Sequence, residues 1–143
     1  MEMQPDKKLS AQVSLEYLIV LAAFFSVLLL FAPLISSIYF NSVFSLDLKQ
    51  AKSFSLEFKN ALKELSVLEN GSVKSISFNP LNEWSIKAEG KLLQVEIESK
   101  DLKKKKTIET ELLQEIVFEN NFSSQTTIKL IKAESGEILI EYS

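Results

Sequence analysis

The sequence contains no cysteine, no histidine and no arginine, and it has only 3 glycines. Without cysteine there can be no disulfide framework, thiolate metal site or thiol nucleophile. Without histidine the chain lacks the commonest metal ligand and the usual general base at neutral pH. Without arginine it cannot make bidentate contacts to phosphates or base edges, and its net charge of −3 gives no reason to expect nucleic acid. We therefore expect no catalytic residue, no metal, no cofactor and no enzyme activity.

What the sequence does contain is a long charge-free run near its N-terminus. The 24 residues from Tyr17 to Phe40 carry no charge, and as a helix they would extend roughly 36 Å, enough to cross a hydrocarbon core of about 30 Å. Lys7 and Lys8 precede the run, so the positive-inside rule predicts a cytoplasmic N-terminus and an outer C-terminal part. A cleaved secretory signal fits less well, because the run is too long and no clean cleavage site follows it. A plain uncleaved anchor remains an alternative.

A short polar motif stands directly before this run. Gln12, Ser14, Glu16 and Tyr17 form the pattern Q-x-S-x-E-Y, which resembles the class III signal peptide of archaeal type IV pilin-like proteins. The resemblance implies that a prepilin peptidase cuts between Ala11 and Gln12, on the cytoplasmic side of the apolar run. Residues 1–11 would then be a cleaved leader, and Glu16 would be the fifth residue of the mature chain, where type IV pilins generally carry a glutamate. Ala11 departs from the glycine that is usual before the cut.

The same resemblance implies a structural function. The precursor would reside in the cell membrane and be polymerised by a pilus assembly ATPase and a membrane platform protein into a surface filament of identical subunits. In that filament the new α-amino group of Gln12 would pair with Glu16 of a neighbouring subunit and set the register between them. Alternatively, Glu16 lies at the headgroup boundary or caps its own helix. The alternative function is a minor pilin, or a membrane-tethered module for adhesion or solute recognition.

Beyond the run, the apolar residues keep a helical spacing. They recur every three or four positions, with charged residues on the other faces, and Asn70-Gly71 supplies a left-handed stop signal. This stripe comprises Leu48, Ala51, Phe54, Phe58, Leu62, Leu65 and Leu68. The pattern predicts one helix from about Val13 to Glu69, whose membrane or filament-core part is 12–40 and whose amphipathic extension is 41–70. The extension needs a partner to cover its apolar stripe.

The remaining residues, 71–143, predict an outer β-rich head. Apolar residues largely alternate in short segments, and Asn79-Pro80, Glu89-Gly90 and Ser135-Gly136 separate these segments, the last two as hairpin turns. Residues 103–121 suit either a helical turn or an irregular strand. An antiparallel sheet laid on the helix stripe gives an α+β fold of the type IV pilin kind.

Two further features invite functional interpretations. The four lysines of Lys103–Lys106 could bind an anion or a glycan, although a solvated turn or a protected strand edge is the simpler interpretation. Asn70 and Asn121 each begin an N-x-S sequon in a predicted loop. On the outer side of the membrane both would be candidate N-glycosylation sites, as is common in archaeal pilins.

Overall fold

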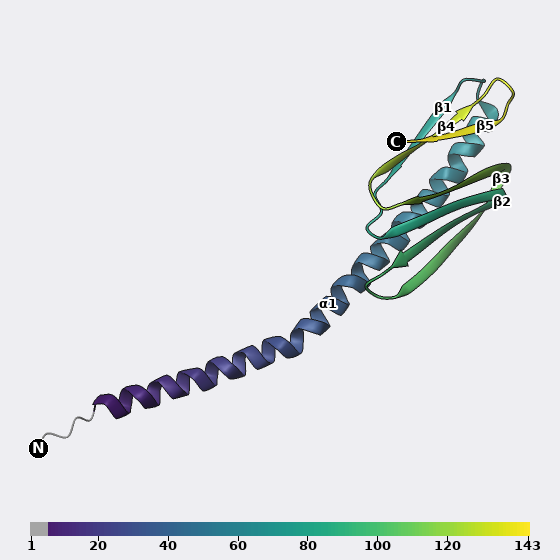
Figure 1. Cartoon of the computed structure of the whole chain (residues 1–143). Coiled ribbons are helices and arrows are strands. Elements are labelled where there is room, and N and C mark those ends of the chain that lie inside the picture. The colour runs from purple at the N-terminus through teal and green to yellow at the C-terminus, as the bar shows by residue number, and fades with distance from the viewer. Residues whose placement is uncertain (1–5) are drawn as a thin grey trace, which may run out of the picture. The chain divides into compact units, whose positions relative to one another are not determined.

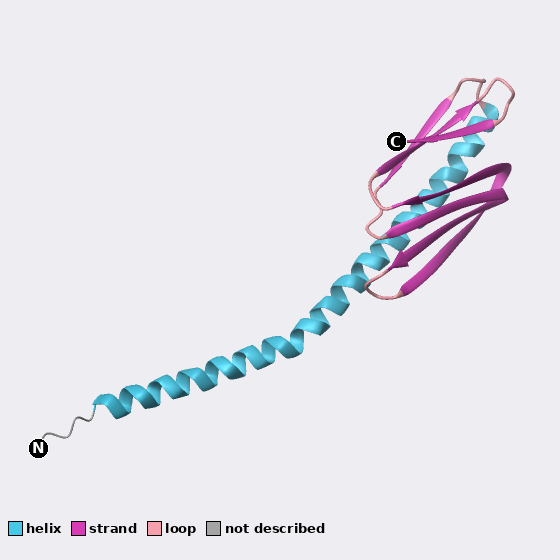
Figure 2. Cartoon of the chain, in the orientation of Figure 1, coloured by secondary structure: helices cyan, strands magenta, loops and turns pink. Residues whose placement is uncertain are grey.

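The computed structural model of this chain describes the backbone of residues 6–143 and the side chains of residues 14–143. It has an α+β fold in which one long N-terminal helix, α1 (Asp6–Val67), precedes five antiparallel strands, as Figures 1 and 2 show. The chain divides into two compact units, the first reaching Tyr39 and the second spanning Phe40–Ser143. We call the second unit the head unit. The predicted long helix and antiparallel β-structure are confirmed.

The end of α1 differs from the prediction. The helix stops at Val67, and Gly71 is left-handed (φ 85°) but belongs to the turn that follows, in which Ser72 N donates to Glu69 O. The helix end is capped by a distant side chain instead. Lys132 Nζ donates to Ser66 O at 3.2 Å and to Leu68 O at 2.7 Å, so a cation satisfies two carbonyl groups at the helix end and complements the negative end of the helix dipole.

The strands form two sheets rather than one. β1 (Val73–Phe78), β4 (Thr126–Lys132) and β5 (Ile138–Tyr142) pair in the order β1-β4-β5, while β2 (Glu83–Ser99) and β3 (Lys104–Phe122) form a two-stranded sheet. The expected break at Asn79-Pro80 separates β1 from β2. The expected hairpin at Ser135-Gly136 is confirmed, because β4 and β5 pair across it and Gly136 has a φ of 84°.

The hairpin expected at Glu89-Gly90 is wrong. Gly90 has a positive φ (63°) but lies inside β2, where it marks a bulge. Gly90 pairs with Ile116 and Leu92 pairs with Glu111, so residues 112–115 of β3 lie opposite Lys91 alone. The true turn is Lys100–Lys103, and residues 103–121 belong almost wholly to β3. A positive φ at glycine is favoured in bulges as well as in turns, so the glycine alone does not distinguish the two.

The core of the head unit lies between the outer part of α1 and the two sheets. Phe58 and Leu62, expected to be buried, are 0% and 1% exposed. The strands supply the other side of this core with Ile76, Phe78, Trp84, Ile86, Leu93, Val95, Ile97, Ile128 and Leu130. Phe78 stacks on Trp84 with ring centroids 5.3 Å apart, and Phe54 of α1 lies 4.7 Å from Phe78. The sheets therefore cover the helix stripe as the sequence predicts, except that Leu68 is 41% exposed.

Candidate functional site

The first candidate functional surface is the apolar part of α1. Every side chain from Ser14 to Tyr39 is exposed, and the apolar window within α1 is long enough to cross a membrane while none of it is buried. By its length and composition, this part of α1 is a candidate membrane span. Because apolar surface of this extent is unfavourable in water, the segment requires lipid or protein around it.

Two tyrosines bracket this surface. Tyr17 and Tyr39 are both mostly exposed and lie 22 positions apart, which corresponds to about 33 Å along a helix. Tyrosine is enriched at both membrane–water interfaces, where its ring is apolar and its hydroxyl is solvated. Between them, Ser26 Oγ donates to Ala22 O at 2.8 Å, so this hydroxyl is satisfied within the helix and needs no water.

The motif residues lie at the start of the apolar surface. Ser14, Glu16 and Tyr17 are exposed on α1, and Glu16 takes part in no ion pair among the side chains of residues 14–143. Ala11 and Gln12 fall outside the described side chains, and the first five residues of the predicted leader lie outside the described residues altogether. The carboxylate of Glu16 is thus open to a partner from outside the described part of the chain.

Asp47 is a polar site that the sequence analysis missed. Its side chain is 0% exposed, and it accepts three hydrogen bonds from the β1–β2 connection. Leu81 N donates to Oδ1 at 2.9 Å, while Asn82 N and Asn82 Nδ2 donate to Oδ2 at 2.6 and 2.7 Å. A buried carboxylate requires such donors, because desolvation without them is costly. Asp47 therefore fixes the loop before β2 onto the helix.

The lysine-rich segment forms the turn and the first part of β3. We call Lys100–Lys106 the lysine tip. Lys100 pairs with Glu83 at 3.0 Å and Lys105 with Glu96 at 2.7 Å, and the hydrogen bonds to these carboxylates raise the pKa of both ammonium groups. Lys104 Nζ instead donates to Asn41 Oδ1 of α1 at 3.0 Å. The segment is a solvated turn and strand, in agreement with the simpler of the two interpretations of the four lysines. It also contacts the helix.

The two sequons lie in different settings. Asn70 is in the turn after α1, where its Nδ2, the atom that would carry a glycan, donates to Glu134 O at 3.0 Å. Asn121 is not in a loop as expected, because β3 continues to Phe122, and it pairs with Ser85 of β2. Both asparagines are exposed. Phe122, the middle residue of the second sequon, is buried in the core. Glycosylation at either site stays a prediction.

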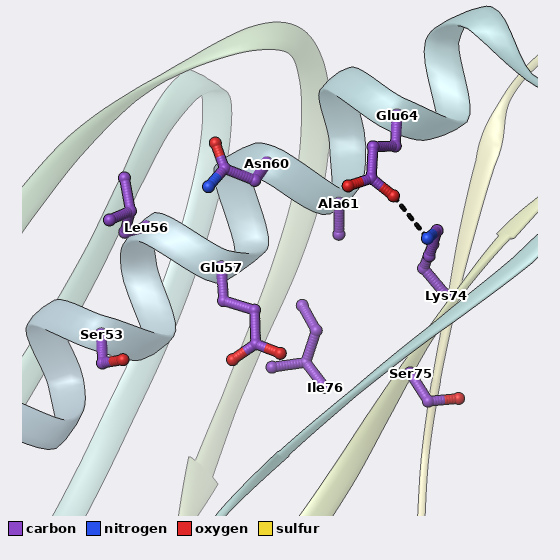
Figure 3. A pocket seen from close by; sticks show the side chains of 9 residues that line it. All are labelled: Ser53, Leu56, Glu57, Asn60, Ala61, Glu64, Lys74, Ser75 and Ile76. Atoms are coloured by element: carbon purple, nitrogen blue, oxygen red, sulfur yellow. Dashed lines mark ion pairs between the residues drawn. The ribbon is translucent and has the colours of Figure 1, made fainter.

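A shallow groove lies between α1 and β1. Its volume is about 410 Å³, and Figure 3 shows the Glu64 carboxylate on the helix directed at the Lys74 ammonium on the strand, with which it forms an ion pair. The other lining residues are Ser53, Leu56, Glu57, Asn60, Ala61, Ser75 and Ile76. The groove offers hydroxyl, amide and carboxylate groups, a lining suited to polar contacts.

The described residues contain no group of three or more acidic side chains that could hold a metal ion. No protein family, curated protein or solved structure matches the chain.

Proposed function

We propose that this protein is the structural subunit of a type IV pilin-like surface filament. The chain is inserted in the membrane as a precursor with its N-terminus inside, is cleaved between Ala11 and Gln12, and polymerises through its apolar helix. The observation that carries the proposal is the motif Q-x-S-x-E-Y standing directly before an apolar helical surface that the chain itself leaves uncovered. An apolar helix of this kind can be surrounded by lipid or by copies of itself, so one segment serves both storage and assembly.

The proposed role of Glu16 rests on the same observation. Cleavage creates an α-amino group at Gln12, and inside a core of apolar helices an unpaired charge is expensive. Pairing of this amine with Glu16 of a neighbour offsets part of the desolvation cost. Since a shifted helix would leave both charges without a partner, the pair favours one axial register. The exposed and unpaired state of Glu16 in the described single chain is compatible with this role.

The experiment that tests the proposal is electron microscopy of surface filaments together with mass spectrometry of the purified fibres. We expect filaments in which this chain is the principal protein, and we expect them to disappear when its gene is deleted. Filaments that persist in the deletion strain with unchanged abundance and length would overturn the assignment as principal subunit.

A scarce tip subunit or membrane-tethered binding module is the second candidate. The observation in its favour is the polar groove between α1 and β1, which presents Asn60, Glu57 and the Glu64–Lys74 ion pair to solvent. Abundance separates the two functions, because a principal subunit must be plentiful and a tip or tethered module need not be. A chain present at only a few copies per filament would favour the second candidate.

A further inference from the structure

The lysine tip lies beside the first turn of α1 that follows the predicted span. Lys104 Nζ donates to Asn41 Oδ1, and Asn41 is the next residue after Phe40, the last residue of the predicted membrane span. Both residues belong to the head unit. In Figure 1 the turn between β2 and β3 lies against α1 at the end of the head unit where this unit's part of the helix begins. The tip therefore lies at the level at which a membrane-spanning α1 leaves the hydrocarbon.

The tip retains positive charge that its neighbours do not neutralise. Glu83 and Glu96 are each occupied by one lysine, Lys100 and Lys105. Lys103 and Lys106 form no ion pair within the described part of the chain, and Lys104 bonds to a neutral amide. Two exposed carboxylates of the same hairpin offset part of this charge. Asp101 lies in the turn, and Glu98 is opposite Lys105 in the strand register.

The turn that carries these lysines is anchored to the head unit, while the lysines themselves are exposed. Leu102, in the middle of the turn, packs against the hydrophobic core and anchors it. Lys103 has a φ of 50°, a left-handed conformation that costs a non-glycine residue roughly 1 kcal/mol and that glycine or asparagine adopts more easily. Lys103 thus occupies a position at which the turn geometry alone favours glycine or asparagine. Lysine side chains also extend farther than those of Asp101 and Glu98, so their ammonium groups reach a nearby surface first.

We propose that the lysine tip binds the phosphate groups of anionic lipids at the outer surface of the membrane and holds the head unit against the bilayer before assembly. A negatively charged membrane surface attracts each nearby lysine, and this attraction falls off within one Debye length. Only a tip at the membrane level satisfies that distance limit. The inference rests on the membrane span of the proposed function but does not require polymerisation.

The test uses the full chain in lipid nanodiscs, with an environment-sensitive fluorophore on a cysteine introduced by Thr107→Cys. Thr107 is exposed next to the tip and the native chain has no cysteine, so the label is unique. One set of nanodiscs contains phosphatidylcholine alone, and the other contains phosphatidylglycerol as well. A quencher attached to the lipid headgroups then reports the ratio of docked to undocked tips.

Two variants with equal loss of charge are compared. Lys103→Gln/Lys104→Gln removes two lysines from the tip, whereas Lys91→Gln/Lys129→Gln removes two exposed lysines elsewhere on the head unit. Each lysine near an anionic surface is worth about fivefold in binding, so we expect the tip variant to lower the docked ratio in phosphatidylglycerol roughly tenfold or more. The control variant should keep most of the docking, and about 1 M salt should abolish it because charges are then screened within about 3 Å.

Equal quenching with and without phosphatidylglycerol would overturn the inference, as would equal losses in the two variants. The comparison of lipids and salt on the Thr107→Cys chain alone decides the question even if a lysine variant fails to fold, which the emission of the buried Trp84 would reveal. Failure of the chain to enter nanodiscs would count against the membrane span and hence the proposed function. Entry without lipid dependence would count only against the lysine tip.

Discussion

The two units of the chain use apolar residues in opposite ways. From Ser14 to Tyr39 the phenylalanines and leucines of α1 are exposed, whereas beyond Phe40 the apolar stripe of the same helix, including Phe54, Phe58 and Leu62, is buried under the strands. Phe25 is 54% exposed and Phe58 is 0% exposed, although both lie on one helix. The difference shows that the apolar residues of the head unit are buried by the single chain itself. Burial of the first unit has to come from lipid or from protein outside this chain.

The polar contacts of the two units also differ. The head unit ties α1 to its strands through Lys104–Asn41, through Asp47 and the loop before β2, and through the Lys132 cap at the helix end. In the first unit, the hydrogen bond from Ser26 to the carbonyl of Ala22 is local to the helix. Stability and assembly should therefore respond to different residues, and each of the following predictions tests that separation.

The largest effect is expected from Glu16→Gln on assembly. The change keeps the shape of the side chain and removes its charge, which leaves the neighbouring α-amino group unpaired in the filament core and costs roughly 3–5 kcal/mol per subunit contact. We expect insertion and cleavage to continue while filament yield, measured by electron microscopy and sedimentation, collapses. Glu141→Gln, an exposed change in β5, is the control and should assemble normally.

Normal filaments from the Glu16→Gln chain would contradict the pairing. So would a cyclised Gln12, which has lost its positive charge, found by mass spectrometry in working native filaments.

Phe58→Ala should strongly destabilise the head unit. Phe58 is fully buried and its ring lies 5.8 Å from that of Phe54, so truncation leaves a cavity and costs roughly 3–5 kcal/mol. Denaturant unfolding of the full chain in detergent micelles can be followed by the emission of Trp84, the single tryptophan of the chain. Phe25→Ala is the matched control, with the same substitution on the exposed part of α1.

The expected result for Phe25→Ala is an unchanged midpoint of head unfolding. Equal destabilisation by both substitutions would show that the two units are not separate in the way proposed here.

Asp47→Ala should have a moderate effect on the same unfolding transition. The substitution removes the acceptors of three hydrogen bonds from Leu81 and Asn82. Since hydrogen bonds to a charged group contribute more than neutral ones, and the donors would be left without this acceptor, we expect a cost of roughly 2–3 kcal/mol. Asp101→Ala removes an exposed carboxylate and should stay within about 0.5 kcal/mol of the native chain. If Asp47→Ala were as mild as Asp101→Ala, the loop would not depend on this carboxylate.

The smallest effect is expected from Gly90→Ala. Gly90 adopts a φ of +63° with open space around it, so the cost is the left-handed conformation rather than a clash. This cost is partly offset by the lower entropy of the unfolded alanine chain, which leaves a net loss of about 1 kcal/mol. Lys91→Ala, at the next position of the same bulge, is exposed and should be neutral. A neutral Gly90→Ala would mean that β2 relaxes the bulge at no cost.

The sequence predicted the parts of this molecule whose signal is local. The charge-free run, the apolar stripe containing Phe58 and Leu62, and the division into helix and strands all depend on spacing along the chain, and the structure agrees with them. The motif before the run is equally local, although its role in cleavage and register stays a prediction.

The features that the sequence did not predict depend on distant partners. Asp47 is an ordinary charged residue in the sequence and becomes a buried acceptor only because the loop with Leu81 and Asn82 folds onto it. Lys132 caps a helix that ends 65 positions earlier, at Val67, so no local pattern could have indicated it. Gly90 gave a true signal for a positive φ, but pairing with β3 made it a bulge instead of a turn.

The most direct test of the central claim is mass spectrometry of the N-terminus of the mature protein. If the apolar part of α1 is kept for assembly, the mature chain begins at Gln12 and retains the entire run from Tyr17 to Phe40. A mature chain that begins beyond Phe31 would have lost most of this surface to ordinary secretion, and it would contradict the account.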